Sequence, residues 1–248
     1  MQKQLDKLNL DYEIFEAIDG SRLSEEKIRE NANLDVYKDN PNWINRGYGT
    51  VACAISHHKV YAHMVKNKIP RALILEDDAI VSKDLKEILI NLESMNNIDK
   101  KELILFYTIS INGEFTPTKI SSLNQKKIIK KFNLAYPLNT NVWTTTAYSI
   151  SYESALKFIE VYPKVERVSD AWREFYQKEI FSTIRCIVPF PIKPADFDST
   201  RYRIQKKFNF KAFFYKYNKK RYDFFKKKYL MINEKSILDM DNIQKTSR

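Results

Sequence analysis

The sequence predicts an α/β fold in which helices flank a central sheet, and three observations support this prediction. Short apolar runs with the length of buried strands alternate along the chain with longer amphipathic segments. A chain of 248 residues with 44% apolar side chains can bury one sizeable core. Only four glycines and eight prolines, with no repeat, argue against a fibrous, repeat-built or disordered chain. We therefore expect one globular body.

The first part of the chain predicts two short helices and one strand. Residues 2–8 have a helical pattern, and residues 12–19 alternate in the manner of a half-buried strand. Residues 24–31 predict a short polar helix. The following segment, up to Tyr48, is rich in Asn, Asp and Pro, which is typical of a surface loop.

A strong amphipathic helix is predicted to begin at Gly49 and to end before Pro70. Four residues recur at helical spacing and mark its buried face: Cys53, His57, Tyr61 and Met64. The apolar run at residues 72–75 then has the length of a strand that is buried on both faces.

The rest of the body alternates helices with strands, which supports the layered α/β prediction. Helices are predicted at residues 82–95, 152–162 and about 170–178, the last capped by Ser169. Strands are predicted at residues 102–111, 143–151 and 186–188, with 189–194 extended. Residues 112–140 are expected to form an irregular insertion, and the body is expected to end near Thr200.

Three acids, Glu76, Asp77 and Asp78, stand at the carboxyl end of the 72–75 strand, the edge at which open α/β sheets bind ligands. Alternation along a strand would direct Glu76 and Asp78 to one face. Converging carboxylates repel unless a cation neutralises them, and their hard oxygens suit Mg²⁺ or Mn²⁺ bridging a diphosphate. The alternative is a solvated strand end, since acids are common in surface turns.

The net charge of +11 is concentrated near the C-terminus. Residues 201–230 hold twelve Lys/Arg and one acid, Asp223, while the rest of the chain holds thirty basic and thirty acidic residues. The same thirty residues contain eleven aromatic side chains. We therefore divide the chain into a body at residues 1–200 and a basic, aromatic-rich tail at residues 201–248.

Three interpretations of the tail are open. A helix over residues 201–230 with aromatics on one side and cations on the others would lie in an anionic membrane interface, where each basic residue contributes about 1 kcal/mol. Such a helix would alternatively pack its aromatic face on the body. Basic, aromatic segments also bind nucleic acids, but the neutral body disfavours that partner. We expect membrane association and no nucleic acid.

The two cysteines, Cys53 and Cys186, form no CxxC or Cys/His zinc pattern, so neither a disulfide framework nor a structural zinc site is expected. The histidines lie within residues 57–63, and neighbouring pairs lack the spacing of a metal-binding pair. No stretch approaches the roughly 20 apolar residues of a spanning helix. The N-terminus has no signal-peptide pattern, so we expect a cytoplasmic protein.

Residues 49–57 (GTVACAISH), followed by a helix and then residues 72–79 (ALILEDDA), resemble glycosyltransferase family 25, the lipooligosaccharide and related galactosyltransferases. The family pattern starts a helix with G-E-I-G-C-A-L-S-H and ends a strand with L-E-D-D-A. The second motif matches fully, whereas Thr50 and Ala52 replace the usual Glu and Gly of the first. Shorter likenesses extend the resemblance over about residues 8–203, at residues 12–23, 147–151, 168–170 and 189–200.

This resemblance implies a GT-A-like (Rossmann-like) fold with a mixed sheet flanked by helices. It also implies transfer of a hexose, galactose from UDP-galactose, to a lipooligosaccharide or lipopolysaccharide acceptor sugar. Asp78 would coordinate Mn²⁺ or Mg²⁺ together with Glu76, and Asp77 would contact the ribose or a second metal-bound water. The basic segment at residues 201–230 would hold such an enzyme beside its lipid-linked acceptor, on the inner face of the cytoplasmic membrane.

The family also has an N-terminal strand with an I-N-L-like end, which helps to bind the nucleotide. The present sequence begins at the helix that follows it, so residues 1–200 are expected to lack this strand. The alternative to an enzyme is a truncated, non-catalytic relative that acts as a binding module.

Asp170 is the predicted general base of an inverting transfer, or an acceptor-binding carboxylate, because it stands at a predicted loop-to-helix junction. The alternative is an acid favoured by the helix macrodipole. Asp196 and Asp198 could serve instead, or form Asx turns. Ser56 and His57 are expected near a helix start, where backbone N–H groups favour the donor phosphates. His57 is alternatively a hydrogen-bonded core histidine.

Overall fold

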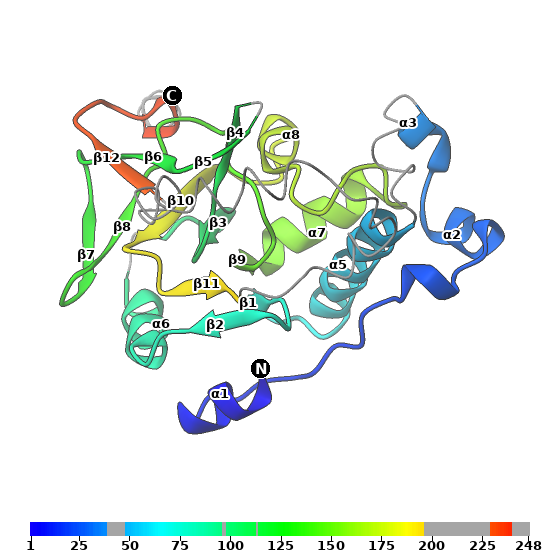
Figure 1. Ribbon diagram of the computed structural model, residues 1–248, viewed down its shortest axis with the longest axis horizontal. Helices are drawn as coiled ribbons and strands as arrows, with labels where there is room; N and C mark the ends of the chain where they lie inside the picture. Colours follow the sequence, from blue (N-terminus) through cyan, green and yellow to red (C-terminus); the bar gives the residue numbers. More distant parts are fainter. Residues whose placement is uncertain (39–47, 96–97, 113, 196–228, 240–248) are drawn as a thin grey trace, which may run out of the picture.

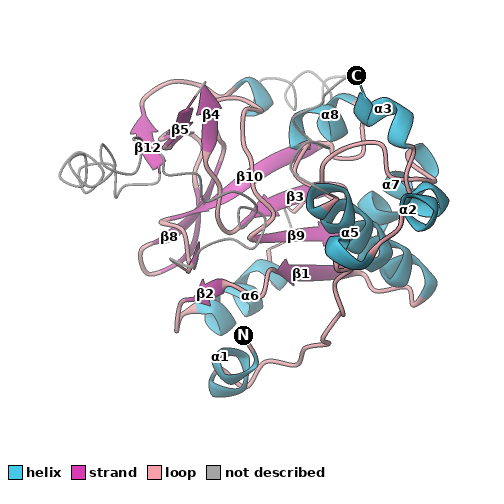
Figure 2. Ribbon diagram, turned by 45° about the vertical axis from the view of Figure 1, so that its right-hand side comes forward, coloured by secondary structure: helices cyan, strands magenta, loops and turns pink. Residues whose placement is uncertain are grey.

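The computed structural model describes residues 1–38, 48–95, 98–112, 114–195 and 229–239, and its centre is a mixed six-stranded sheet (Figures 1 and 2). The strand order is β1-β9-β3-β10-β8-β7. In that order the strands are Arg71–Leu75, Ala147–Ser151, Glu102–Leu105, Thr183–Val188, Phe132–Ala135 and Lys126–Ile129. Neighbours are antiparallel except β3 and β10, which are parallel. The predicted α/β class with a mixed sheet is confirmed.

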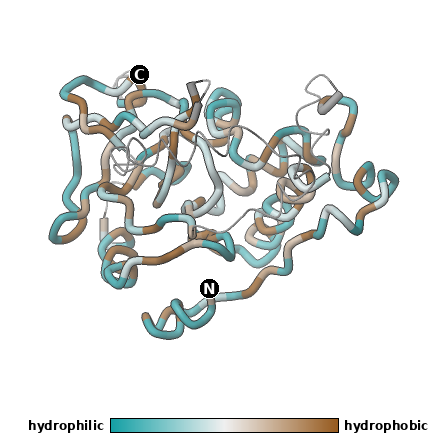
Figure 3. Tube along the Cα trace, in the orientation of Figure 1, coloured by the Kyte–Doolittle hydropathy of each residue, from teal (hydrophilic) through white to brown (hydrophobic). Residues whose placement is uncertain are grey.

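The sheet separates two apolar cores because side chains alternate along each strand. In β3 and the residue after it, Leu103 and Leu105 point into one core, whereas Ile104 and Phe106 point into the other. The first core is covered by three helices, α5 (Gly49–Lys66), α7 (Tyr152–Val161) and α8 (Trp172–Gln177), and the second by α6 (Leu85–Glu93). Figure 3 shows polar and apolar residues on the same helices, as expected of helices that cover a core on one side.

The helix α5 begins at Gly49, as predicted, and ends at Lys66, before Pro70. His57, Tyr61 and Met64 are buried on its predicted inner face, and Cys53 at the same face is half-buried. A second side of α5 packs in a smaller cluster, which consists of Ile28, Ala32, Leu34, Val51, Ala54, Ile55 and Val165. Because α5 contacts two clusters, it ties the N-terminal elements to the sheet.

The N-terminal helices are α1 (Gln2–Lys7), the 3₁₀ helix η1 (Gly20–Arg22), α2 (Glu25–Asn31) and α3 (Leu34–Lys38). Two of them, α1 and α2, were predicted, whereas α3 lies in the segment before Tyr48 that was predicted to be a surface loop. Ser24 caps α2 by accepting a hydrogen bond from the backbone N–H of Lys27. Gly20 lies against the start of α5, where a Cβ atom would stand 2.9 Å from the Tyr48 carbonyl oxygen. Only glycine fits this contact without a shift of the backbone.

The strand predicted at residues 12–19 is not formed. This segment is extended across the outside of α5 and exposes Tyr12, Ile14 and Phe15. It contacts side chains of α5 instead of a neighbouring strand: the Ile18 N–H donates to Ser56 Oγ at 2.9 Å, and the Phe15 ring meets the His63 ring edge-on. Alternation alone therefore predicted a strand where no described strand lies alongside to pair with it.

Residues 102–151 differ most from the prediction. The strand predicted at 102–111 is divided into β3 and β4 (Ser110–Asn112), and the predicted strand at 143–151 begins only at Ala147. The supposed irregular insertion at 112–140 contains β5 (Glu114–Thr116), β6 (Thr118–Ser121), β7 and β8. These strands are three or four residues long, so each is too short to show a clear alternation in the sequence.

Two further pairs of strands close the body. β2 (Ala79–Val81) pairs antiparallel with β11 (Ile192–Pro194), and β12 (Tyr229–Ile232) pairs parallel with β6. Leu238 is fully buried in the first core. Residues 229–239 thus pack on the body, whereas residues 201–228, which carry the predicted helical tail, lie outside the described residues. Among the described helices, none has the length and apolar character required to cross a bilayer.

A buried ion pair joins two strands of the sheet. Glu102 and Arg185 are 0% and 4% exposed, and the guanidinium donates to both carboxylate oxygens, with Nη2 2.6 Å from Oε2. The backbone N–H of Asp99 also donates to Glu102, at 3.2 Å. The charges compensate each other inside the core, so removal of one would leave the other uncompensated.

We expect Arg185→Met to lower the free energy of unfolding by about 3–5 kcal/mol, because Glu102 would keep a buried charge without its partner. The matched control is Lys157→Met, which breaks the exposed pair with Glu160 (3.6 Å) and should cost less than about 1 kcal/mol. Urea denaturation followed by circular dichroism measures both. Equal losses in the two variants would contradict the assigned role of the buried pair.

Candidate functional site

A large cleft of about 2170 Å³ runs along the open edge of β1. β1 is the terminal strand of the six-stranded sheet, and no other described strand pairs with its second edge. The walls are β1 with the turn after it, one side of α5, part of α6 and the N-terminal segment. The cleft brings together the residues that the sequence assigned to the donor, which are Ser56, His57, Glu76, Asp77 and Asp78.

The three acids form a tight turn directly after β1. The strand ends at Leu75, and the Ala79 N–H donates to the Glu76 carbonyl oxygen at 3.1 Å. Glu76 and Asp78 are half-buried, whereas Asp77 is exposed. The acids therefore stand at the strand end that the sequence predicted, but the turn, rather than strand alternation, sets their directions.

The loop at residues 143–146 fixes Glu76 from the side of β9. Thr145 Oγ1 donates to Glu76 Oε1 at 2.5 Å, and the Glu76 N–H donates to the Thr146 carbonyl oxygen at 3.0 Å. Both the backbone and the carboxylate of Glu76 are thus held by one loop. A carboxylate that is held in this way is preorganised for a ligand in the cleft.

Thr144 in the same loop has a φ angle of +88°, which is rare for a β-branched residue. Its N–H donates to Asp170 Oδ2 at 3.0 Å, and its carbonyl oxygen accepts from Trp172 Nε1 at 3.2 Å. Its hydroxyl lies 2.7 Å from that of Thr146. Such a conformation costs about 1–3 kcal/mol and persists only where surrounding contacts impose it, often next to a functional site.

Asp170 lies behind this loop rather than in the cleft wall. It is half-buried, and it is absent from the described residues that line the cleft. The predicted N-terminal cap of the following helix is wrong, because α8 begins at Trp172 after Ala171 and no side chain caps it. Ser169 instead lies beside Cys53, with 3.4 Å between Oγ and Sγ. Asp196 and Asp198 lie outside the described residues.

Ser56 and His57 do not stand at a helix start, since α5 begins seven residues before Ser56. The backbone N–H groups at these positions lie inside the helix, so the predicted phosphate contact from a helix N-terminus does not apply to them. Ser56 Oγ donates to the Ala52 carbonyl oxygen at 2.8 Å and accepts from the Ile18 N–H. Ser56 therefore attaches the N-terminal segment to α5.

His57 belongs to a hydrogen-bonded chain that crosses the first core. Its Nδ1 lies 2.6 Å from the Tyr148 hydroxyl, which lies 2.6 Å from the Tyr61 hydroxyl. Burial raises the pKa of both tyrosine hydroxyls, so both stay protonated. His57 is 8% exposed, which agrees with its interpretation as a hydrogen-bonded core histidine, although its ring also reaches the cleft.

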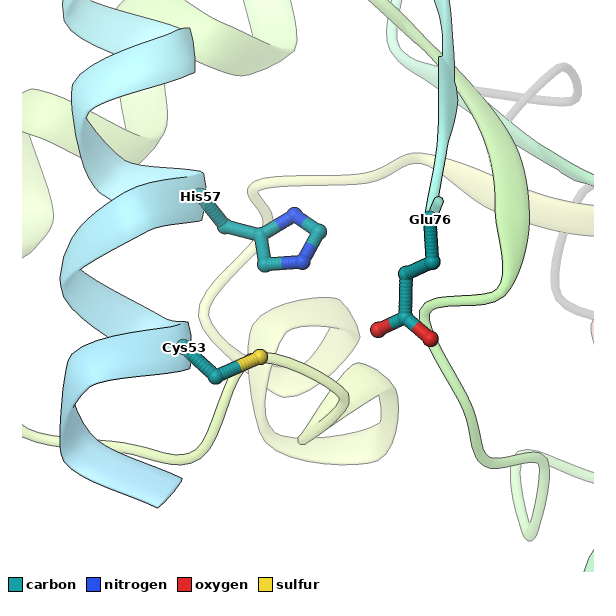
Figure 4. A group of neighbouring side chains, drawn as sticks. All are labelled: Cys53, His57 and Glu76. Carbon is teal, nitrogen blue, oxygen red and sulfur yellow. The ribbon is translucent and has the colours of Figure 1, made fainter. Parts of the chain in front are cut away.

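The sequence pattern placed Cys53 on the buried face of the helix and gave it no role as a ligand, but the structure brings it close to His57 and Glu76. A ligand atom from each of Cys53, His57 and Glu76 lies within 4.8 Å of those of the other two. Figure 4 shows the thiol and the imidazole on one side of α5, both directed toward the carboxylate. The available signal was the i, i+4 spacing of Cys53 and His57, because such residues share a helix face.

A family model described as "Glycosyltransferase family 25 (LPS biosynthesis protein)" matches residues 1–172. The chain belongs to glycosyltransferase family 25. The match spans α5, the acidic turn and Asp170, so the whole region described above lies inside the family domain. The family takes its name from glycosyl transfer.

Relatives of this family-25 chain occur in animals. It is 26% identical to a glycosyltransferase 25 family member of Drosophila melanogaster and 25% identical to human procollagen galactosyltransferase 2, each over 166 residues. Over 80 residues it is 35% identical to a glycosyltransferase 25 family member of Aedes aegypti. The longer matches cover 66% of this chain, and they span about 25% of the length of the relatives.

We expect Tyr148→Phe to lower the free energy of unfolding of this family-25 domain by about 1–3 kcal/mol, because His57 Nδ1 and the Tyr61 hydroxyl would lose a buried partner. The control is Tyr152→Phe, whose half-buried hydroxyl has no hydrogen-bond partner among the described residues. Urea denaturation measures the difference. If Tyr148→Phe is as stable as the control, the hydrogen bonds from Tyr148 to His57 and Tyr61 do not stabilise this face of α5.

Proposed function

We propose that this family-25 chain transfers galactose from UDP-galactose to a sugar hydroxyl of a lipooligosaccharide or lipopolysaccharide acceptor. The observation that carries the proposal is the acidic turn at Glu76–Asp78, which lines a large cleft at the end of β1. The family description as an LPS biosynthesis protein supports the acceptor class, and the name of the human relative supports galactose. A GT-A-like arrangement agrees with the mixed sheet flanked by helices.

Glu76 and Asp78 are the proposed ligands of Mn²⁺ or Mg²⁺. Both carboxylates are half-buried and line the cleft, and hard oxygen donors of this kind fit these cations. When bound, the cation would offset the negative charge that develops on the departing nucleotide diphosphate. Asp77, exposed between them, is the proposed contact to the ribose or to a second metal-bound water.

Asp170 is the proposed base. The transfer forms a bond between the acceptor oxygen and the anomeric carbon and breaks the bond from that carbon to the diphosphate oxygen, with inversion. The proton of the acceptor hydroxyl moves to Asp170. The Thr144 N–H holds one oxygen of this carboxylate, and the same loop holds Glu76 through Thr145, which supports a shared site.

A second candidate function is a binding module that holds the nucleotide without transfer. It is favoured by the position of Asp170, which accepts a hydrogen bond from Thr144 and does not line the described cleft. In that case Asp170 only positions the loop beside Glu76. UDP binding without transfer of the sugar would support this candidate.

The proposed acceptor also motivates a place in the cell. Residues 201–230 carry the excess positive charge and eleven aromatic residues, a composition suited to an anionic membrane surface. We propose that the chain works in the cytoplasm, at the inner face of the membrane that carries its lipid-linked acceptor. Nucleic acid is not a proposed partner.

Asp78→Ala should weaken the binding of UDP in the presence of Mn²⁺ by at least about 10–100-fold, since loss of a ligand should cost no less than loss of a group that supports one. Calorimetry with the full chain, with and without Mn²⁺, measures this effect. The control Glu160→Ala removes an exposed carboxylate of α7 outside the cleft and should bind as the wild type does. Metal-independent UDP binding, or no binding at all, would refute the proposed donor site.

The Asp170→Asn variant distinguishes the two possible roles of Asp170, as the base or as a residue that positions the loop. The amide oxygen can still accept from the Thr144 N–H, so thermal stability should stay near that of the wild type. If Asp170 is the base, kcat falls by about 10²–10⁴-fold while UDP affinity is kept. If it only positions the loop, Asp170→Asn behaves as the wild type in every assay, and Asp170→Ala loses both stability and UDP affinity.

A further inference from the structure

We infer that Cys53, His57 and Glu76 form a binding site for a zinc-type divalent cation, distinct in its ligand chemistry from the proposed Mn²⁺ or Mg²⁺ site. The three side chains come from two elements, since Cys53 and His57 belong to α5 and Glu76 follows β1. Figure 4 shows the sulfur, the imidazole ring and the carboxylate directed toward a common space. The inference does not depend on glycosyl transfer.

The geometry needs only small adjustments to hold an ion. The three ligand atoms lie within 4.8 Å of one another. Tetrahedral zinc with its usual bond lengths separates its ligand atoms by roughly 3.3–3.7 Å. Rotation of the thiol and of the carboxylate closes a difference of about 1 Å without movement of the backbone. One helical turn separates Cys53 from His57, so both can contact the same ion.

Each of the three residues is held from behind by a second hydrogen-bonding group. Tyr148 contacts Nδ1 of His57 at 2.6 Å, so Nε2, on the other side of the ring, faces the thiol and the carboxylate. Thr145 donates to Glu76 at 2.5 Å, and Ser169 Oγ lies 3.4 Å from Cys53 Sγ. Supporting groups of this kind orient metal ligands in proteins and raise their affinity for the ion.

The ligand set selects the metal. A thiolate, an imidazole and a carboxylate are the three ligand types of protein zinc sites, whereas Mg²⁺ and Mn²⁺ prefer oxygen. Three protein ligands would leave a fourth position of the ion for water or another ligand, which is typical of zinc sites that are open to solvent. Cys53, His57 and Glu76 all line the cleft, so an ion can reach them.

Glu76 is shared between this site and the proposed donor site. A zinc ion bound by Cys53 and His57 would draw the carboxylate of Glu76 toward α5 and away from Asp78. Zinc should therefore weaken the Mn²⁺-dependent binding of UDP, and the loss should require Cys53. Asp78 is absent from the three-residue cluster, so a change at Asp78 should leave zinc binding intact.

The test uses the full chain after removal of metals, with Co²⁺ as a spectroscopic probe and Zn²⁺ in calorimetry. Wild type should bind one equivalent of either ion, and Co²⁺ should give the near-ultraviolet charge-transfer band of a cobalt–thiolate bond. Cys53→Ser should abolish the band and weaken zinc binding by at least about 10–100-fold. Glu76→Gln should weaken zinc binding by a similar factor. Circular dichroism verifies that each variant is folded.

Two matched controls locate the site. Cys186→Ala removes the other cysteine, which is buried in the first core, and His63→Gln removes a half-buried histidine of the same helix as Cys53. Both variants should keep the band and the affinity of the wild type. No cobalt–thiolate band in the wild type, or a band that survives Cys53→Ser, would overturn the inference. Loss of zinc binding in His63→Gln instead would assign it to the helix surface.

The two metal proposals fail separately. If zinc binds through Cys53 but UDP does not bind with Mn²⁺, the inference stands and the donor site is wrong. If UDP binds with Mn²⁺ and no cobalt–thiolate band forms, the three side chains are only a hydrogen-bonded cluster and the inference is wrong. Asp78→Asn adds an internal comparison, because this variant should lose the Mn²⁺-dependent binding of UDP and keep the binding of zinc.

Discussion

The site depends on the way in which one loop restrains one carboxylate. Thr145 and Thr146 hold the side chain and the backbone of Glu76, and Thr144 adopts a rare left-handed conformation between them and Asp170. The loop thus connects the acidic turn after β1 to the start of α8. If this connection were lost, the three acids would form an ordinary solvated turn, in which nothing fixes their carboxylates relative to the cleft.

The inner face of α5 packs in the core along one part of its length and lines the cleft along another. Toward the core, Tyr61 and Met64 are fully buried, and the tyrosine continues the hydrogen-bonded chain through Tyr148 to His57. One turn closer to its start, Cys53 is only half-buried and reaches the cleft. The helix therefore changes from apolar packing to polar, ligand-like side chains along a single face, and the change occurs beside Glu76.

The sequence could predict those parts of the fold that depend on local patterns. The long periodicity of α5, the helix α7 after β9 and the acids after β1 each lie in one continuous segment, so the predicted positions agree with the structure within a few residues. The short strands of residues 112–140 are stabilised by distant partners, for example β8 by β10 and β6 by β12, and local alternation does not report such partners. At residues 12–19 the alternation predicted a strand that does not form, since no described strand lies beside this segment to pair with it.

The candidate site was predictable only in its acidic half. Glu76, Asp77 and Asp78 are adjacent in the sequence, whereas Cys53 and His57 come close to Glu76 only because the fold brings one face of α5 beside the turn after β1. Cysteine and histidine spacing in the sequence could not reveal this group, because Glu76 follows β1 whereas Cys53 and His57 lie on α5. Glu76 consequently stands between soft ligands on the helix and hard carboxylates in the turn. In the two proposed sites, a cation that prefers oxygen would draw Glu76 toward Asp78, and a cation that prefers sulfur and nitrogen would draw it toward α5. Because both proposed sites need this one carboxylate, an ion bound in one of them would weaken the other.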